Sequence, residues 1–295
     1  MSPNATGALC MVLAMAGFAI EDTLFKAATA TVSPGLATMI FGILGLSGFA
    51  VLSGLSGERV WTAQALSPRL LVRSGFEITG RLFFALALAF APLSLSSAIL
   101  QAAPLVVTLG AALFLGERVG AGRWAAMGVG FAGVLLILRP GAAAFDPALI
   151  FAVLATLGFA GRDLATRASP PEVSANQLGT LGFAVVTLAG AIILAVSGDA
   201  PAMPDARGAA LLLGTAIAGV MAYSALTRAM RTGEVSVVAP FRYVRLLFAL
   251  GLAALIFGER PDWPVWAGAA LIVGSGLYTL VRSRPRTGTA RRSGL

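Results

Sequence analysis

The sequence predicts an all-α membrane protein in which ten transmembrane helices form two inverted five-helix repeats. Three observations support this fold class: an apolar composition, ten apolar segments of membrane-spanning length, and similar stretches about half a chain apart. Of 295 residues, 58% are hydrophobic and 12% are charged, and the mean hydropathy is +0.88. Soluble domains carry about 25% charged residues, so this composition excludes a soluble globular protein.

Clusters of glycine, proline and charged residues separate the ten apolar segments, as expected of turns. A helix needs about 20 apolar residues to cross the hydrocarbon core. The predicted spans are 6–26, 34–53, 70–90, 94–115, 122–139, 147–166, 174–196, 207–227, 235–257 and 264–281. The connections are too short to hold a soluble domain.

Basic residues are distributed unevenly between the two ends of these spans. With the N-terminus inside, 14 lysines and arginines lie on the inner side, 4 on the outer side and 3 within spans. Because inner loops of membrane proteins are enriched in basic residues, both termini are predicted to be cytoplasmic, including a basic tail at 283–295. The first ten residues lack the basic region of a signal peptide, so the first helix is expected to remain. The expected location is the inner (plasma) membrane of a bacterium.

Two pairs of similar stretches lie almost the same distance apart. "AALFLGER" at 111–118 matches "AALIFGER" at 253–260 with an offset of 142 residues. "VLAMAGFAIEDTLFKA" at 12–27 matches "VLATLGFAGRDLATRA" at 153–168 with an offset of 141, and 8 of 16 residues are identical. The shared polar positions favour a duplication over the chance similarity of apolar helices.

The duplication predicts a first five-helix repeat at 1–140 and a second at 141–282. Five is an odd number, so the second repeat enters the membrane in the opposite sense. Inverted repeats of this kind are associated with alternating-access transporters, which bind substrate between the halves near the middle of the membrane.

The two Gly-Glu-Arg motifs carry a family resemblance. "LFLGERVGAGRWAAMGVGFAGVLLI" ends the fourth span and begins the fifth, and "LIFGERPDWPVWAGAALIVGSGLY" does the same for the ninth and tenth. With the five-plus-five arrangement, these segments resemble the EamA-type drug/metabolite transporters over about residues 5–282. The resemblance implies a secondary transporter of the amino-acid and metabolite exporter branch, without catalytic residues.

Gly116 is predicted to end its helix in a left-handed conformation, and Glu117 is expected to bond nearby backbone groups. Gly258 and Glu259 repeat this motif near the other membrane face. Pro240 lies inside the ninth span, where it removes a backbone donor and predicts a kink.

Charged side chains within spans mark the candidate binding site. Glu77 and Arg81 lie four residues apart and can pair on one helix face. Arg242 and Arg245 share a face near the middle of the ninth span. A charge at that depth costs about 2.5–3.5 kcal/mol on insertion scales and normally faces a protein interior or an aqueous cavity.

These arginines have two interpretations. In a structural network, Glu77 neutralises one arginine and locks the third span to the ninth. In a solvated cavity, the arginines bind a substrate carboxylate or phosphate, which a guanidinium matches through two hydrogen bonds. One carboxylate facing three guanidinium groups leaves the network short of anions and favours the cavity. Two further mid-span residues, which bind either a ligand or a neighbouring helix, complete the predicted site: Glu77, Arg81, Gln101, Arg242, Tyr243 and Arg245.

The favoured function is export of small metabolites, with amino acids as the preferred class. A multidrug or lipid transporter of the same fold is the alternative, and the repeat does not exclude a channel. The chain has no histidine, one cysteine and no Gly-x-x-x-x-Gly-Lys loop, which argues against an enzyme with a His-ligated metal, a thiolate cluster or ATP hydrolysis. We expect no catalytic residue, metal, cofactor or nucleic-acid partner. The expected partners are the bilayer and a small molecule bearing a carboxylate, and the oligomeric state stays open.

The expected mode of energy coupling depends on whether an acidic residue inside the membrane can bind a proton. Glu77 is the one acid predicted near the middle of the membrane, and three arginines at similar depth are expected to keep it ionised. Facilitated transport is therefore favoured over proton antiport. Nearer the helix ends, Asp22 is expected to pair with Lys26 and Asp163 with Arg167, four residues along each helix.

Overall fold

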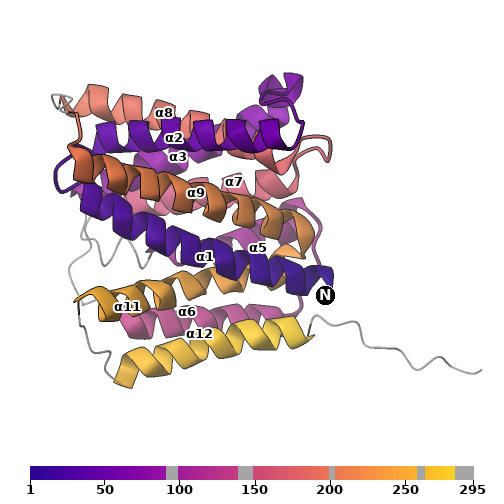
Figure 1. Cartoon of the computed structure of the whole chain (residues 1–295). Helices are drawn as coiled ribbons and strands as arrows, with labels where there is room; N and C mark the ends of the chain where they lie inside the picture. The colour runs from indigo at the N-terminus through magenta and orange to yellow at the C-terminus, as the bar shows by residue number, and fades with distance from the viewer. Residues whose placement is uncertain (91–98, 139–148, 199–202, 258–262, 283–295) are drawn as a thin grey trace, which may run out of the picture.

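The computed structural model describes residues 1–90, 99–138, 149–198, 203–257 and 263–282, and these form helices and turns with no strand among them (Figure 1). The elements are α1 (Pro3–Ala28), α2 (Pro34–Leu55), η1 (Ala63–Leu66), α3 (Pro68–Phe90), α5 (Ala103–Phe114), α6 (Ala121–Leu138), α7 (Leu149–Arg167), α8 (Ala175–Ser197), α9 (Ala206–Thr232), α10 (Val235–Val238), η2 (Ala239–Tyr243), α11 (Val244–Phe257) and α12 (Trp263–Arg282). The predicted all-helical fold is confirmed.

Five of the described helices, namely α1, α2, α8, α9 and α12, are long and apolar enough to cross a membrane. The predicted spans 70–90, 122–139 and 147–166 coincide closely with α3, α6 and α7. The fourth predicted span lies partly outside the described residues, and α5 forms its second half.

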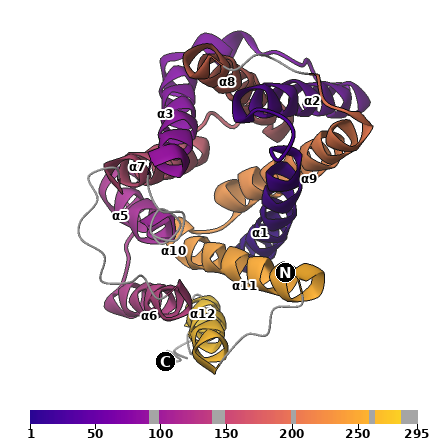
Figure 2. The same cartoon turned by 90° about the vertical axis from the view of Figure 1, so that its left-hand side faces the viewer.

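Most contacts between described helices come from four pairs, α1 with α9, α2 with α8, α3 with α7, and α6 with α12. Each pair joins one helix from the first half of the chain to one from the second half. Figure 1 shows α2 beside α8, and the end-on view in Figure 2 shows α6 and α12 together at one edge. The two halves are therefore interleaved and share one bundle.

Small residues set the spacing in two of these pairs. A Cβ atom on Gly158 of α7 would lie 2.5 Å from the backbone nitrogen of Gly80 in α3. A Cβ atom on Gly17 of α1 would lie 2.8 Å from the Cβ of Ala222 in α9. Gly17 and Gly158 are 141 residues apart, and Gly80 and Ala222 are 142 apart. The same contact thus occurs twice between the two halves, at positions that are equivalent in the internal repeat, as expected of a duplication.

The ninth predicted span is broken. A short helix, α10, passes into the 3-10 turn η2, and α11 continues from there. Pro240 lies in the first turn of η2 and has no backbone N–H to donate, so the predicted kink is realised as a change of helix type. Arg242 lies in this turn, and Arg245 lies at the start of α11.

The first Gly-Glu-Arg motif behaves as predicted. Gly116 has a φ of +68°, the left-handed conformation expected after α5. The Glu117 carboxylate accepts hydrogen bonds from the backbone N–H groups of Val235, at 2.7 Å, and Ser236, at 3.1 Å. It therefore caps the N-terminus of α10. Residues 258–260, the second copy of the motif, lie outside the described residues.

Candidate functional site

A central cavity of about 250 Å³ lies between both halves of the chain. Its walls come from α1, α3, α7, η2, α11 and the segment 100–104 that leads into α5. Polar contributions come from Gln101 and Thr156 and from a set of charged side chains: Glu21, Asp22, Arg81, Arg162, Arg242 and Arg245. A cavity that is lined by charged side chains from both halves of the chain can hold a small solute with polar groups.

The cavity brings together Arg81, Gln101, Arg242 and Arg245 of the six predicted residues. Glu77 is fully buried behind the wall, where its carboxylate is bonded to other side chains.

Tyr243 is not among the residues that line the cavity. It is buried in a cluster with Val134 and Ile272, and its ring lies 2.8 Å from where a Cβ on Gly130 would be. Its hydroxyl has no hydrogen-bond partner among the described residues. Tyr243 thus packs α6 and α12 against the broken ninth span.

Glu77 is the centre of a buried network. Oε1 accepts a hydrogen bond from Arg162 Nη1 at 2.9 Å, and Oε2 accepts one from the Tyr223 hydroxyl at 2.8 Å. Arg73 Nη2 lies 3.7 Å from Oε2, and Arg81 Nε lies 4.0 Å from Oε1. The prediction that Glu77 locks the third span to the ninth is wrong. The network joins α3 to α7 and α9, which are the sixth and eighth predicted spans.

The arginines of the ninth span pair with two aspartates instead. Asp163 accepts hydrogen bonds from Arg162 Nε, at 2.8 Å, and from Arg242 Nη1. Asp22 accepts from Arg245 Nε, at 3.0 Å, and also from Nη2.

The predicted pairs of Asp22 with Lys26 and of Asp163 with Arg167 are absent among the ion pairs of the described residues. Asp163 is buried and Asp22 lines the cavity, and an arginine of the ninth predicted span reaches each of them. Arg167 instead donates to the Met230 carbonyl at 3.3 Å.

The charge balance differs from the prediction of one carboxylate against three arginines. Within the described residues, the network and cavity hold five arginines and four acids, a net charge of +1 with all groups ionised. These are Arg73, Arg81, Arg162, Arg242, Arg245, Glu21, Asp22, Glu77 and Asp163. Arginines therefore outnumber acids by one, and not by two as predicted.

Arg162 and Glu21 line the cavity but are not among the predicted site residues, because both lie close to the ends of the predicted spans 147–166 and 6–26. The internal repeat contains a signal that could have identified these two residues. Glu21 and Arg162 occupy equivalent positions, as do Asp22 and Asp163, so two adjacent charged residues recur in the first helix of each half.

Two phenylalanines at equivalent positions support the arginines. Arg245 lies 5.3 Å from the ring centroid of Phe18. Arg162 and Arg81 lie 5.4 and 5.9 Å from the centroid of Phe159. Contact with an aromatic face stabilises a cation by about 0.5–2 kcal/mol, so these rings hold the guanidinium groups in place.

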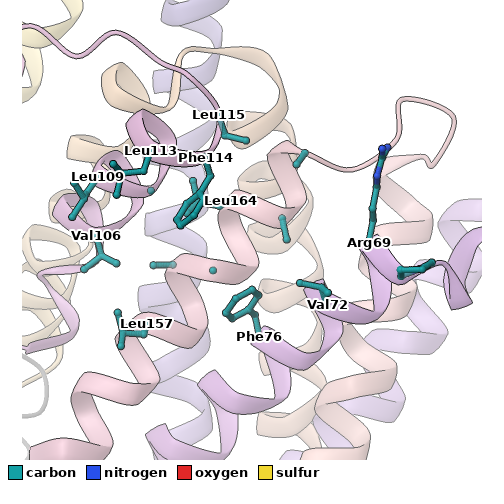
Figure 3. Close-up of a pocket in the computed structure, with 16 residues that line it drawn as sticks. Arg69, Val72, Phe76, Val106, Leu109, Leu113, Phe114, Leu115, Leu157 and Leu164 are labelled. Carbon is teal, nitrogen blue, oxygen red and sulfur yellow. The ribbon is translucent and has the colours of Figure 1, made fainter.

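A separate groove of about 960 Å³ lies between α3, α5 and α7. Figure 3 shows its apolar lining, including Phe76, Phe114, Leu157 and Leu164. Arg69 stands at one end with its charged group directed away from these side chains (Figure 3). An apolar groove of this kind suits hydrocarbon chains, so it offers no site for a polar metabolite.

The described fold agrees with comparisons to known proteins. A sequence profile described as "EamA-like transporter family" matches residues 5–139 and 146–281. The chain belongs to the EamA-like transporter family. It is therefore a multi-pass membrane transporter with duplicated halves and not an enzyme. A solved structure described only as "Crystal structure of protein" superposes with a TM-score of 0.82 at 18% identity, over 95% of this chain and 99% of that one.

Several characterised transporters are similar to this EamA-like chain. A riboflavin transporter of Rhizobium johnstonii is 29% identical, over 93% of this chain and 90% of its own length. A pseudopaline exporter of Pseudomonas aeruginosa is 28% identical, over 91% of this chain and 93% of its own. An S-adenosylmethionine uptake transporter of Rickettsia conorii is 27% identical, over 65% of each chain. These relatives indicate a transporter of small metabolites.

Proposed function

We propose that this EamA-like transporter exports small metabolites of the amino-acid class by alternating access. The observation that carries the proposal is the mixed charge of the cavity wall. Arg81 and Arg245 can receive a carboxylate, while Glu21 and Asp22 on α1 can receive an ammonium group. A ligand carrying both charges meets complementary groups from helices of both halves, and a guanidinium binds a carboxylate through a pair of parallel hydrogen bonds.

The size of the cavity supports a small substrate. Its volume of about 250 Å³ is below the 300–1,000 Å³ typical of pockets for drug-sized ligands. The net charge of +1 also favours a substrate that brings at least one anionic group. A multidrug transporter for large cations fits this arrangement less well.

A flavin is the second candidate substrate. Phe18, Phe84 and Phe159 all line the cavity, and aromatic rings stack favourably with a flat heterocycle. The similarity to the Rhizobium johnstonii riboflavin transporter over most of both chains also favours this candidate.

Counterflow in proteoliposomes tests both candidates. Vesicles loaded with one unlabelled compound are diluted into the same compound carrying a radiolabel, with separate assays for amino acids, riboflavin, S-adenosylmethionine and a sugar. We expect label to accumulate for amino acids and not for the sugar. Accumulation of riboflavin alone would favour riboflavin over amino acids as the substrate. Equal passive leakage of all four compounds would indicate a channel.

Export requires a defined orientation, and we propose that both termini are cytoplasmic. The 14-to-4 distribution of basic residues supports this orientation. A reporter fused to the C-terminus should read cytoplasmic, and a cysteine placed at 200–206 should react with an impermeant reagent from outside. Labelling of the C-terminal tail from outside would overturn the proposed orientation.

A further inference from the structure

Glu21 is an unpaired acid on the wall of the cavity. Its side chain belongs to the lining, yet the residue is only 6% exposed. Oε2 is fully buried and has no hydrogen-bond partner among the described residues. A buried charged group without a partner is costly, so an orphaned carboxyl at the edge of a transport cavity requires a functional explanation.

The internal repeat shows why this acid has no partner. Glu21 of α1 is equivalent to Arg162 of α7, and Gly219 of α9 is equivalent to Glu77 of α3. In the α3–α7 pair, Arg162 donates to Glu77 at 2.9 Å. In the α1–α9 pair, Oε2 of Glu21 lies 3.1 Å from the place that a Cβ on Gly219 would take. The acid therefore faces a glycine where its counterpart meets an opposite charge.

The charged groups around Glu21 come from four helices. Asp22 follows it on α1, and Arg81, Arg162 and Arg245 approach from α3, α7 and α11. None of them forms a hydrogen bond or ion pair with Glu21 among the interactions of the described residues, and Arg81 Nε is itself without a hydrogen-bond partner. On the α9 side, Gly219 and the nearby ring of Phe41 in α2 offer no polar group. A charge on Glu21 is thus stabilised by these arginines only through space, without a hydrogen bond or ion pair among the described residues.

Proton binding would have a different effect at each acid of the centre. A proton on Glu77 would weaken its bonds to Arg162 and Tyr223. A proton on Asp163 or Asp22 would weaken an ion pair with an arginine. At Glu21, a proton breaks no hydrogen bond or ion pair that the described residues form. Glu21 is therefore the acid that can exchange a proton without disturbing the scaffold.

We propose that Glu21 is a proton-binding site in the transport cavity, where a proton and the ammonium group of the substrate compete. This inference rests on the proposed function. One proton adds to the carboxylate as the substrate leaves on the outer side, and the same proton leaves to the cytoplasm before the next substrate binds. Proton entry then drives export. This reverses the expectation of facilitated transport, which considered Glu77 alone.

The proton site is tested without any substrate. The purified protein in detergent is titrated from about pH 9 to about pH 5 while infrared difference spectra follow the carbonyl band of protonated carboxylic acids. We expect a band in the wild type and in the exposed-loop control Glu172→Gln, and no such band in Glu21→Gln. Glu21→Asp, which keeps an acid, should retain a shifted band. A wild type without a band of a buried acid, or a band that persists in Glu21→Gln, would overturn the proposal.

Coupling is tested separately in proteoliposomes that contain standard amino acids and a pH-sensitive dye. Dilution into amino-acid-free buffer should acidify the lumen for the wild type and for Glu172→Gln, and not for Glu21→Gln. Amino-acid efflux without acidification in the wild type would overturn the coupling. If no amino acid leaves the vesicles, the proposed substrate class fails, and the infrared titration alone decides whether Glu21 binds a proton.

Discussion

Arg242 in η2 donates a hydrogen bond to Asp163 in α7. One helical turn further on, Arg245 donates to Asp22 in α1. Asp22 and Asp163 occupy equivalent positions in the two halves of the chain. Two arginines of one broken span therefore each bond to an aspartate from a different half of the chain, in addition to the helix pairs that join the halves.

Replacing Arg242 with glutamine is expected to lower stability. The Asp163 carboxylate is only 1% exposed and would keep Arg162 as its remaining cation. Loss of one charge-assisted hydrogen bond costs about 1.5–3 kcal/mol. A double-mutant cycle with Asp163→Asn, followed by thermal unfolding in detergent, should show a coupling energy of at least about 0.5 kcal/mol. Additive effects would mean that the pair contributes nothing to stability.

Arg245→Gln is expected to behave differently. Its side chain is 35% exposed and that of Asp22 is 53% exposed, so the pair lies within reach of solvent. Such pairs contribute about 0–1 kcal/mol, and the unfolding temperature should change little. If Arg245 binds the substrate carboxylate, affinity should fall by about 10- to 150-fold. Unchanged affinity in equilibrium binding would make Arg245 a scaffold residue.

Glu77→Gln is expected to be strongly destabilising. The carboxylate is fully buried between Arg162, Tyr223 and Arg73. The amide would leave Arg73 without its ion pair and Arg162 with Asp163 alone. Breaking a buried ion pair costs about 3–5 kcal/mol. Thermal unfolding should show a large loss for this variant and none for Glu172→Gln, a matched change in an exposed loop. Near-native stability would show that Glu77 is neutral in the folded protein.

Gly158→Ala tests the close contact between α3 and α7. The added methyl group would lie 2.5 Å from the Gly80 nitrogen, so the helices must separate. Overpacking of this kind costs about 1–3 kcal/mol.

Gly128→Ala in α6 is the matched control, because no atom lies within 4 Å of its added Cβ. The alanine should be neutral or stabilise the helix by up to about 1 kcal/mol. Equal unfolding temperatures for the two variants would mean that the α3–α7 contact adapts without strain.

The sequence predicts much of the fold for physical reasons. Hydropathy gives the length of an apolar segment, and the repeat offset indicates a duplication, so the helical class and most span positions could be predicted. The Glu117 cap could be predicted from the Gly-Glu-Arg motif. The partners of the buried charged side chains could not be predicted. Arg162 and Asp163 were assigned to a helix end because hydropathy gives depth and not the direction of a side chain. Their contacts join residues 79 and 85 positions apart, which only the packing of α7 against its neighbours determines.

The break in the ninth predicted span divides it into two helical pieces, α10 and α11, which the 3-10 turn η2 separates. The first piece, α10, is capped by Glu117, while Arg245 near the start of the second piece, α11, bonds to Asp22 in α1. A continuous helix would transmit any tilt along its whole length. The 3-10 turn at Ala239–Tyr243 instead separates the two pieces, and a 3-10 stretch within a helix often marks a hinge. Arg245 therefore belongs to the piece that the Glu117 cap does not hold.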